Sequence, residues 1–409
     1  MAITESVPQD LLLTKKKRLL SLDALRGFDM FWIISGEGIF HGLANGVMKA
    51  HHLIRNPNDW TIASNGHLSF FERFLVGLSN QLHHSVWNGF TFYDLIFPLF
   101  IFISGVSMPF SYEKHLNAGN DKKKSAKGIY YALIKRTLIL ILLGMVVNGL
   151  LKWEGYENTR FASVLGRIAL STFFAALIYL NFSLRKQLIW LLGILLGYYI
   201  IIMTAIPVPG FGSGVLTPEG NLAAYVDRLW LPGKLHRTVY DPEGLLSTIP
   251  AIATALLGVF TGTFLNTKNN RFSLVLKAFY LLMAGIILVS LGLLWNILFP
   301  VNKNMWTSSF VLVAGGFSLV LFSFFYYIID VKAYQKWSLP FIWIGTNSIL
   351  IYVCAHGLFN FESTSQFLFG GVIAKIPLAW QQAGLWLGVL LIQLGILKFL
   401  YDRKWFLKI

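Results

Sequence analysis

The sequence has little charge and almost no cysteine. Only 13% of its 409 residues are charged, about half the share of a typical soluble domain. Cys354 is the single cysteine, which excludes a disulfide within the chain. We find no P-loop, no GxGxxG and no CxxC motif, and no repeat with a period of about 20–50 residues. The common nucleotide-binding, redox and repeat architectures are therefore not indicated.

What the sequence has instead is apolar and aromatic. Hydrophobic residues make up 55% of the chain, with 13 Trp and 16 Tyr. This composition predicts a polytopic integral membrane protein whose partner is the lipid bilayer, with the aromatic residues suited to its interfaces. The net charge of +15 could suggest nucleic acid, but the basic residues are scattered between apolar segments. We therefore predict no nucleic-acid partner.

The apolar segments predict an all-α fold. A membrane-spanning helix needs about 20 mostly apolar residues, and about ten segments qualify. They are residues 22–42, 92–112, 129–151, 162–181, 187–206, 246–265, 275–298, 307–329, 339–359 and 384–401. Residues 366–380 are too short to span and contain Lys375 and Pro377, so we expect an interfacial or re-entrant piece there.

The distribution of Lys and Arg predicts the orientation. The short segments that alternate with the spans, beginning with Lys15–Arg18, hold most of them, while the opposite side has fewer in longer loops. The positive-inside rule then puts both termini in the cytoplasm. We predict a basic cytoplasmic arm at 1–20 and a transmembrane domain at 21–409, with long outer loops at 43–91 and 207–245. The charged first segment lacks a cleavage site, so we expect it to be retained.

The stretch from His83 to Pro109 carries the strongest chemical signal. Asp94 stands at the entrance of an apolar segment, and His84 precedes it by ten residues. A His–carboxylate pair can move protons near neutral pH. The structural alternative is a solvated histidine and an Asp that satisfies free N–H groups at a helix start. Metal binding is not expected, because adjacent histidines point in different directions and no partner spacing is present.

Other polar groups also fall in or near apolar segments. Glu37 lies in the outer third of the first predicted span, where an unpaired carboxylate is costly. Asp241 could cap the predicted helix at 246–265 with Pro242 at its first position. Asn347 and Ser348 lie inside the predicted span 339–359, where helix-to-helix hydrogen bonding is the ordinary explanation.

Five stretches together resemble a known family. They are Ser21–Gly27 (SLDALRG), His84–Pro98 with its HSVWNG and DLIFP elements, Asp241–Gly244 (DPEG), Pro300–Asn304 (PVNKN) and Asn347–Leu350 (NSIL). In this order they resemble the heparan-alpha-glucosaminide N-acetyltransferase family of transmembrane enzymes. The animal members carry an Asn where Glu37 stands here, and a large luminal N-terminal domain. The resemblance therefore indicates a compact bacterial relative in the inner (cytoplasmic) membrane.

The resemblance implies acetyl transfer across the membrane, from cytosolic acetyl-CoA to the amine of a terminal glucosamine-type sugar. His84 matches the family's catalytic histidine and would be the general base, with Asp94 orienting its ring. Direct transfer is favoured over an acetyl-histidine. Glu37 is also assigned to the catalytic set, and Asn347 or Ser348 would donate to the thioester oxygen. The residues that would bind the coenzyme phosphates are Arg26, Lys135, Arg136 and Arg271. The residues that would bind the acceptor are Trp87, Asn88, Asp241, Glu243, Asn302 and Lys303.

Two other classes of function stay open. Ten helices with buried charges would also suit an amino-sugar or proton-coupled sugar transporter, although no inverted repeat is visible. A flippase or another non-enzymatic membrane component is the second alternative. Acetyl-CoA binding with release of free thiol distinguishes the enzyme from both. The acceptor's identity and the oligomeric state, including a homodimer, are not determined by the sequence.

Overall fold

A computed structural model describes residues 19–53, 68–116, 122–152, 154–267 and 272–407. Within these ranges the chain is helical, and its β-structure is limited to two isolated bridges. The predicted all-α class is confirmed. The basic arm at 1–18, Arg271 and residues 54–67 of the first long loop lie outside the described residues.

Eight helices in the described part of the chain are long and apolar enough to cross a membrane. They contain α4 (Phe92–Leu116), α5 (Lys122–Val147), α6 (Val164–Asn181), α7 (Leu184–Ile200), α9 (Thr248–Asn266), α10 (Leu274–Trp295), α11 (Ser308–Phe325) and α15 (Gln381–Asp402). A ninth crossing would be the pair α12 (Leu339–Thr346) and α13 (Ser348–Val353), with the π-helical turn Cys354–Leu358. This pair bends by 66°. The polytopic membrane architecture is thus confirmed.

The first predicted span is helical but differs from the others. It runs through α1 (Leu20–Phe31), a π-helical turn (Trp32–Gly36) and α2 (Glu37–Ala50). It is not among the eight helices that are apolar enough to cross a membrane, so the count of ten and the side on which the termini lie stay predictions. The piece expected at 366–380 overlaps a short helix, α14 (Phe361–Ile373).

Glycines let the central helices approach closely. A Cβ on Gly258 of α9 would lie 2.1 Å from the carbonyl oxygen of Phe102 in α4. A Cβ on Gly345 of α12 would lie 1.9 Å from the carbonyl oxygen of Asp23 in α1. Small residues at such contacts are typical of helix pairs in membranes, where packing rather than hydrophobic burial drives association. These two contacts fix α4 against α9 and α1 against α12.

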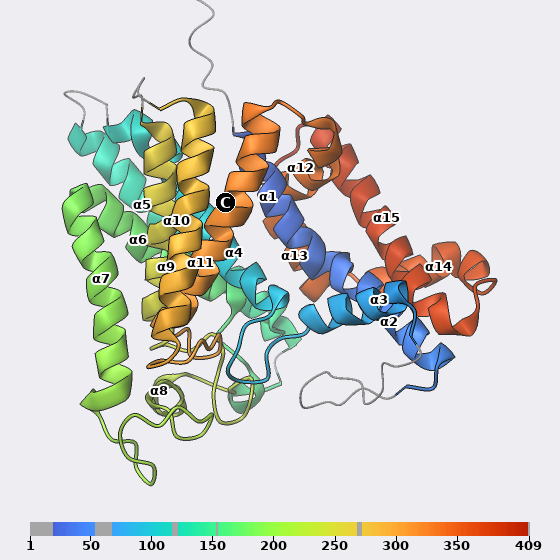
Figure 1. Cartoon of the computed structure of the whole chain (residues 1–409), viewed down its shortest axis with the longest axis horizontal. Helices are drawn as coiled ribbons and strands as arrows, with labels where there is room; N and C mark the ends of the chain where they lie inside the picture. The colour runs from blue at the N-terminus through green and yellow to red at the C-terminus, as the bar shows by residue number, and fades with distance from the viewer. Residues whose placement is uncertain (1–18, 54–67, 117–121, 153, 268–271, 408–409) are drawn as a thin grey trace, which may run out of the picture.

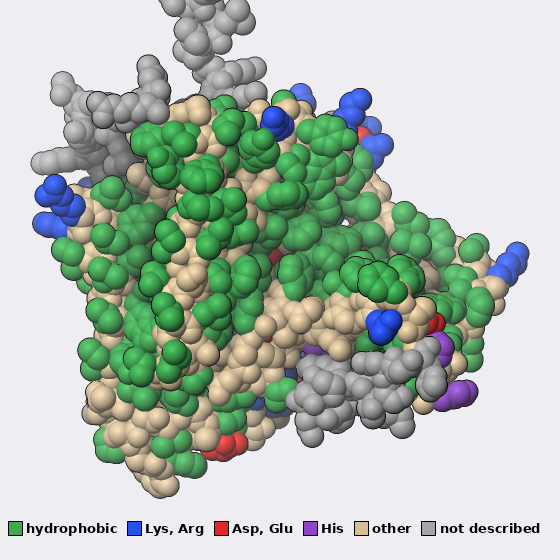
Figure 2. Space-filling model, viewed as in Figure 1, with side chains coloured by type: hydrophobic (Ala, Val, Ile, Leu, Met, Phe, Trp, Pro, Cys, Tyr) green, Lys and Arg blue, Asp and Glu red, His purple; other side chains and the backbone are tan. Residues whose placement is uncertain are grey.

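The helices form two groups (Figure 1). The helices α4–α7 and α9–α11 stand side by side, and α2, α3 (Phe70–Gln81), α14 and α15 lie on the other side of α1. Hydrophobic side chains cover the flanks of the molecule, and several Lys and Arg side chains gather at its upper edge (Figure 2). The first and last described residues, Leu19 and Leu407, line one cavity, so the described chain begins and ends on the same side.

The two long predicted loops meet at the opposite end of the molecule. The first contains the end of α2 and the helix α3, and the second contains α8 (Leu222–Trp230). Trp87 of the first loop donates from its indole nitrogen to the carbonyl oxygen of Leu216 in the second, at 2.7 Å. The loops therefore form a joint cap over the helix ends, where the candidate site lies.

Candidate active site

The N-terminus of α4 holds a buried carboxylate in a fixed position. Thr91 precedes the helix, and Asp94 is its third residue. One carboxylate oxygen of Asp94 accepts from the backbone N–H of Ser85 (3.1 Å) and of Thr91 (3.2 Å), and from the Thr91 hydroxyl (3.1 Å). This arrangement satisfies free donors at a helix start. The capping interpretation of Asp94 is therefore correct for one of its two oxygens.

The other oxygen of Asp94 contacts His84. The distance from Oδ1 to Nδ1 of the imidazole is 2.8 Å. Because a carboxylate only accepts, Nδ1 carries the proton, and Nε2 of the neutral ring is left as an acceptor. Asp94 is fully buried, whereas about half of the His84 side chain is exposed. The His84–Asp94 pair, one of two alternatives that the sequence left open, is thus formed, with the imidazole at the surface of the cavity.

Lys303 approaches His84 from 219 positions away in the sequence. Its Nζ lies 3.0 Å from Nδ1 and 3.2 Å from Nε2, and 3.6 Å from Oδ1 of Asp94. An amine in the ring plane could not meet both ring distances without overlapping Cε1, so it lies over the ring face. Burial, and then the charge of Lys303, hold the pKa of His84 below its usual range against the opposing effect of Asp94. The imidazole is therefore neutral and able to accept a proton.

Backbone and amide contacts hold the Lys303 loop against the His84 loop. The Gly89 N–H donates to the Val301 carbonyl at 2.8 Å, with Gly89 in the positive-φ region (123°) that favours glycine. The Asn302 amide donates to the side-chain oxygen of Asn88 at 3.1 Å. Trp87 anchors the same loop as described above. In this structure Trp87, Asn88 and Asn302 join the loops, and their predicted contact with an acceptor stays a prediction.

Glu37 reaches the site through an aromatic side chain. Its carboxylate accepts a hydrogen bond from the Tyr93 hydroxyl and lies 3.4 Å from Nε2 of His41. The Tyr93 ring packs on His84 with centroids 4.8 Å apart. Glu37 therefore belongs to the cluster around His84, one side chain removed from the imidazole. The sequence reasoning did not assign a role to Tyr93.

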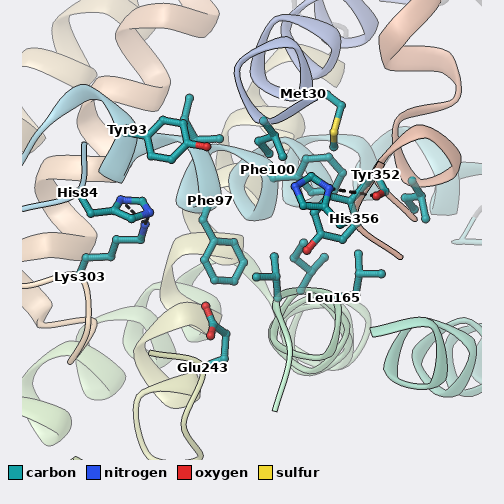
Figure 3. Close-up of a pocket in the computed structure, with 15 residues that line it drawn as sticks. Met30, His84, Tyr93, Phe97, Phe100, Leu165, Glu243, Lys303, Tyr352 and His356 are labelled. Atoms are coloured by element: carbon teal, nitrogen blue, oxygen red, sulfur yellow. Dashed lines mark hydrogen bonds between the residues drawn. The ribbon is translucent and has the colours of Figure 1, made fainter. Parts of the chain in front are cut away.

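A cavity of about 200 Å³ opens beside this cluster, and we call it the His84 cavity. Figure 3 shows His84 and Lys303 on one side of it, Tyr352 and His356 on the other, and Phe97 between them. Glu243 contributes a carboxylate to its edge. The rest of the lining is apolar and comes mainly from α4 and α6. The cavity combines acid–base side chains with an apolar wall, as substrate pockets commonly do.

Glu243 is held by an ion-pair network in the loop before α9. Arg160 donates to both oxygens of Asp241, with its Nε 2.8 Å from Oδ2, and also pairs with Glu243. Asp241 further accepts from the backbone N–H of His236 and of Glu243. Burial alone would raise the pKa of Asp241, but the bonds and charge of Arg160 outweigh it and hold that pKa low. Helix α9 begins only at Thr248, so the expected capping by Asp241 was wrong.

A second cavity lies toward the end of the molecule where the described chain begins and ends. This Arg136 cavity has a volume of about 680 Å³ and is lined by Arg26, Arg136, Asn347 and Ser348, among others. Arg26 lies 3.7 Å from Asp23. The Nε of Arg136 is buried without a hydrogen-bond partner among the described residues. The structure therefore brings four predicted residues together, while Lys135 is exposed on the outside of α5.

Asn347 also has a structural role. Its amide nitrogen donates to the Trp405 carbonyl at 3.0 Å, and its oxygen accepts from the Leu407 N–H at 3.0 Å. It stands at the 66° break between α12 and α13. The expected hydrogen bonding between segments is thus present, but the partner is the C-terminal segment. Neither Asn347 nor Ser348 lines the His84 cavity.

The two cavities share part of their walls. Phe100 of α4 and Ile349 of α13 line both of them. The His84 cavity uses the N-terminal half of α4, and the Arg136 cavity uses the C-terminal half, through Ser104 to Ser111. The cavities thus follow each other along α4 toward opposite ends of the molecule. No group of three His, Cys, Asp or Glu side chains in the described ranges could hold a metal ion.

Comparison with known proteins identifies the family. A family model described as "Heparan-alpha-glucosaminide N-acetyltransferase, catalytic" matches residues 65–293, more than half of the chain. The chain belongs to the heparan-alpha-glucosaminide N-acetyltransferase family. It is 32% identical over 328 residues to the Homo sapiens heparan-alpha-glucosaminide N-acetyltransferase and 30% identical over 330 residues to the Mus musculus protein. Each alignment covers 68% of this chain and 49% of the relative, so the chain spans about half their length.

The residues that match the heparan-alpha-glucosaminide N-acetyltransferase model include only part of the candidate site. His84, Asp94, Arg136 and Glu243 lie within residues 65–293, whereas Lys303 lies beyond them. So do Tyr352 and His356, which the fold brings into the same cavity. His356 is the one polar group in the last turn of its predicted span, and an intramembrane ionisable residue is a reason to suspect function. Tyr93 and Tyr352 gave no such signal, because aromatic residues are common in every span.

Proposed function

We propose that this protein is a transmembrane N-acetyltransferase. It moves an acetyl group from acetyl-CoA, bound at the cytoplasmic side, to the amine of a glucosamine-type sugar on the other side of the membrane. The membrane is the cytoplasmic membrane of a bacterium in this proposal. The donor, the acceptor and the sidedness rest on the family and on the charge distribution along the chain.

The observation that carries the proposal is the pair of cavities that meet at Phe100 and Ile349. Acetyl-CoA is too polar to cross lipid, so a transferase that serves the far side must hold its nucleotide at one end and its thioester near the other. A carrier that binds only a sugar has no need of a separate basic cavity. The arrangement therefore supports transfer of the acetyl group between two sites.

The Arg136 cavity fits the coenzyme. Its two guanidinium groups, Arg26 and Arg136, suit phosphate oxygens, and the unpaired Nε of Arg136 is a donor in need of a partner. The cavity is larger than the His84 cavity, in line with a nucleotide at one end and an acetyl group at the other. Asn347 and Ser348 line this cavity and not the His84 cavity, so the proposal assigns them to the bound coenzyme and leaves out the expected donation to the thioester oxygen.

His84 performs the central proton transfer. Its Nε2 accepts a proton from the acceptor nitrogen as that nitrogen attacks the thioester carbon, while Asp94 holds the ring and stabilises the imidazolium. Burial, and then the charge of Lys303, keep the ring neutral beforehand by lowering the pKa of His84. Glu243, with Arg160 and Asp241 behind it, offers a carboxylate to an ammonium or to sugar hydroxyls at the cavity edge. Transfer is direct in this scheme.

The test uses the purified protein in lipid nanodiscs with acetyl-CoA and a panel of amino sugars, glucosamine first. We expect free thiol and an N-acetylated sugar in equal amounts, identified by mass spectrometry. Binding of acetyl-CoA with no acetylated product from any amine would overturn the proposal. Uptake of amino sugar into vesicles without thiol release would instead favour the transporter alternative.

A further inference from the structure

His356 faces the His84 cavity from its opposite wall, and the scheme above does not use it. It lies in the π-helical turn that ends the bent helix pair, and its side chain is exposed. Besides the His84 cavity, it lines a neighbouring polar cavity of about 620 Å³ together with Gln393 and Glu362. We call this second space the Gln393 cavity. His356 therefore stands where the reaction space meets a polar outlet.

The contacts of His356 fix its tautomer. Its Nδ1 lies 3.2 Å from the backbone carbonyl oxygen of Tyr352, and the two rings stack at 4.7 Å. A carbonyl oxygen only accepts, so Nδ1 carries the proton and Nε2 of the neutral ring is an acceptor. The same logic fixed His84 through Asp94. The cavity thus has two imidazoles on facing walls, each with Nε2 able to take a proton.

The chemistry of amine acetylation requires two such steps. An amino sugar is mostly an ammonium ion near neutral pH, and only the free amine can attack a thioester. One proton must leave the nitrogen before the attack, and a second must leave as the amide forms. A single base that keeps the first proton cannot also take the second. The leaving thiolate can recover only one of the two.

We propose that His356 is the second proton acceptor of the site and receives the proton that the acceptor ammonium loses before attack. This inference rests on the proposed acetyl transfer. The N–H bond of the ammonium breaks and an Nε2–H bond forms on His356. The amine nitrogen then bonds to the carbonyl carbon while His84 takes the second proton. The C–S bond breaks with its electron pair on sulfur, and His84 returns its proton there.

At the end of the reaction one proton remains on His356 and none on His84. The products are the amide and the free thiol, and the extra proton passes from His356 to water in the Gln393 cavity. A carboxylate on the exit side favours this release, because Glu362 lines the Gln393 cavity from α14. The negative charge of Glu37 in α2 also acts on the ring, and it favours the earlier step in which His356 takes up the proton.

Opposing charges also face His356. Lys152 lines the Gln393 cavity, and Lys303 lies across the His84 cavity beside His84. Glu243, Tyr93 and Tyr352 complete the titratable groups in that cavity. Each of these cations shares its cavity with a carboxylate: Lys152 lies with Glu362 in the Gln393 cavity, and Lys303 lies with Glu243 in the His84 cavity. The ring is therefore placed to gain a proton and to lose it again.

The experiment compares pH profiles of kcat/KM for D-glucosamine in wild type, His356→Gln and His84→Ala, with His83→Gln as a histidine control. His83 stacks on His41 and lies outside the cavity. For His356→Gln we expect a loss of about tenfold at one pH unit below the pKa of the acceptor amine, because only about a tenth of the acceptor is then free amine. Its rate should follow the fraction of free amine and approach wild type once the acceptor is deprotonated. The His84→Ala defect should persist at that pH. Added imidazole should restore part of the rate of a His356→Ala variant.

The outcomes separate the two claims. If His356→Gln keeps the wild-type rate, or loses the same factor at every pH, His356 is not the acceptor of the first proton. If wild type acetylates no amine at all, the proposed function fails instead. Unchanged acetyl-CoA affinity and thermal midpoint in His356→Gln would exclude a merely structural defect.

Discussion

Replacing His84 by Ala removes the base without dismantling its surroundings. Asp94 keeps three other donors, from Ser85 and Thr91, and Lys303 stays 3.6 Å from its free oxygen. The carboxylate is therefore not left unpaired, and the cost to folding should be small. Loss of a general base costs about 10²–10⁴-fold in rate, which corresponds to about 3–5 kcal/mol in the barrier. We expect kcat for acetyl transfer to fall by that factor.

The assay follows thiol release and sugar acetylation with saturating acetyl-CoA. Affinity for acetyl-CoA should be largely unchanged, because His84 does not line the Arg136 cavity. His83→Ala is the matched control: its ring stacks on His41 at 4.2 Å, away from the cavity. Near-normal transfer by His84→Ala would refute the reasoning. A dead His83→Ala beside an active His84→Ala would show that the base had been misplaced by one residue.

Three further predictions concern charge. Arg136→Ala should weaken acetyl-CoA binding about ten- to a hundredfold, since a bond to a charged group is worth about 1.5–3 kcal/mol. Lys135 is exposed on the same turn, so Lys135→Ala should leave acetyl-CoA binding unchanged. If calorimetry shows that both variants lose the same affinity for acetyl-CoA, Arg136 is not part of the site. Lys303→Met should raise the pKa of His84, so the acidic limb of the rate profile should move to higher pH; a shift to lower pH would contradict this. Burial raises the pKa of Asp227 to about 6, above about 3.9 when unfolded. Protonated Asp227 therefore contributes to the free energy of unfolding. This contribution is complete below about pH 4 and is lost as pH rises through about 6, where the buried carboxyl ionises. Asp227→Asn should raise the free energy of unfolding by about 2 kcal/mol at pH 8 and leave it unchanged at pH 4. An unchanged thermal midpoint at pH 8 would contradict this.

The predictable parts of the molecule are the local ones. Long apolar runs predicted the eight helices that are long and apolar enough to cross a membrane, because bilayer thickness sets helix length. The sequence showed His84 in the loop before the helix that holds Asp94, but it left a solvated histidine and a capping Asp as the alternative to a pair. The charges in Leu20–Ala50 were visible in the sequence, but the π-helical turn at Trp32–Gly36 was not.

Long-range contacts could not be read from the sequence. Lys303 and His84 meet across 219 positions, and Arg160 meets Asp241 across 81. The break at Asn347 depends on a C-terminal segment that supplies both hydrogen-bond partners of its amide. Nothing in residues 339–359 alone distinguishes that break from a straight helix with a polar side chain. Such features arise from packing, which one sequence does not specify residue by residue.

The central claim is that acetyl groups cross the membrane through this protein. The most direct measurement uses sealed proteoliposomes with acetyl-CoA on one side and glucosamine only on the other, in both arrangements. We predict N-acetylglucosamine in the glucosamine compartment and free CoA in the acetyl-CoA compartment, with both products formed about 10²–10⁴-fold more slowly by the His84→Ala variant. Acetylated sugar formed only when the two substrates share a compartment would contradict the account.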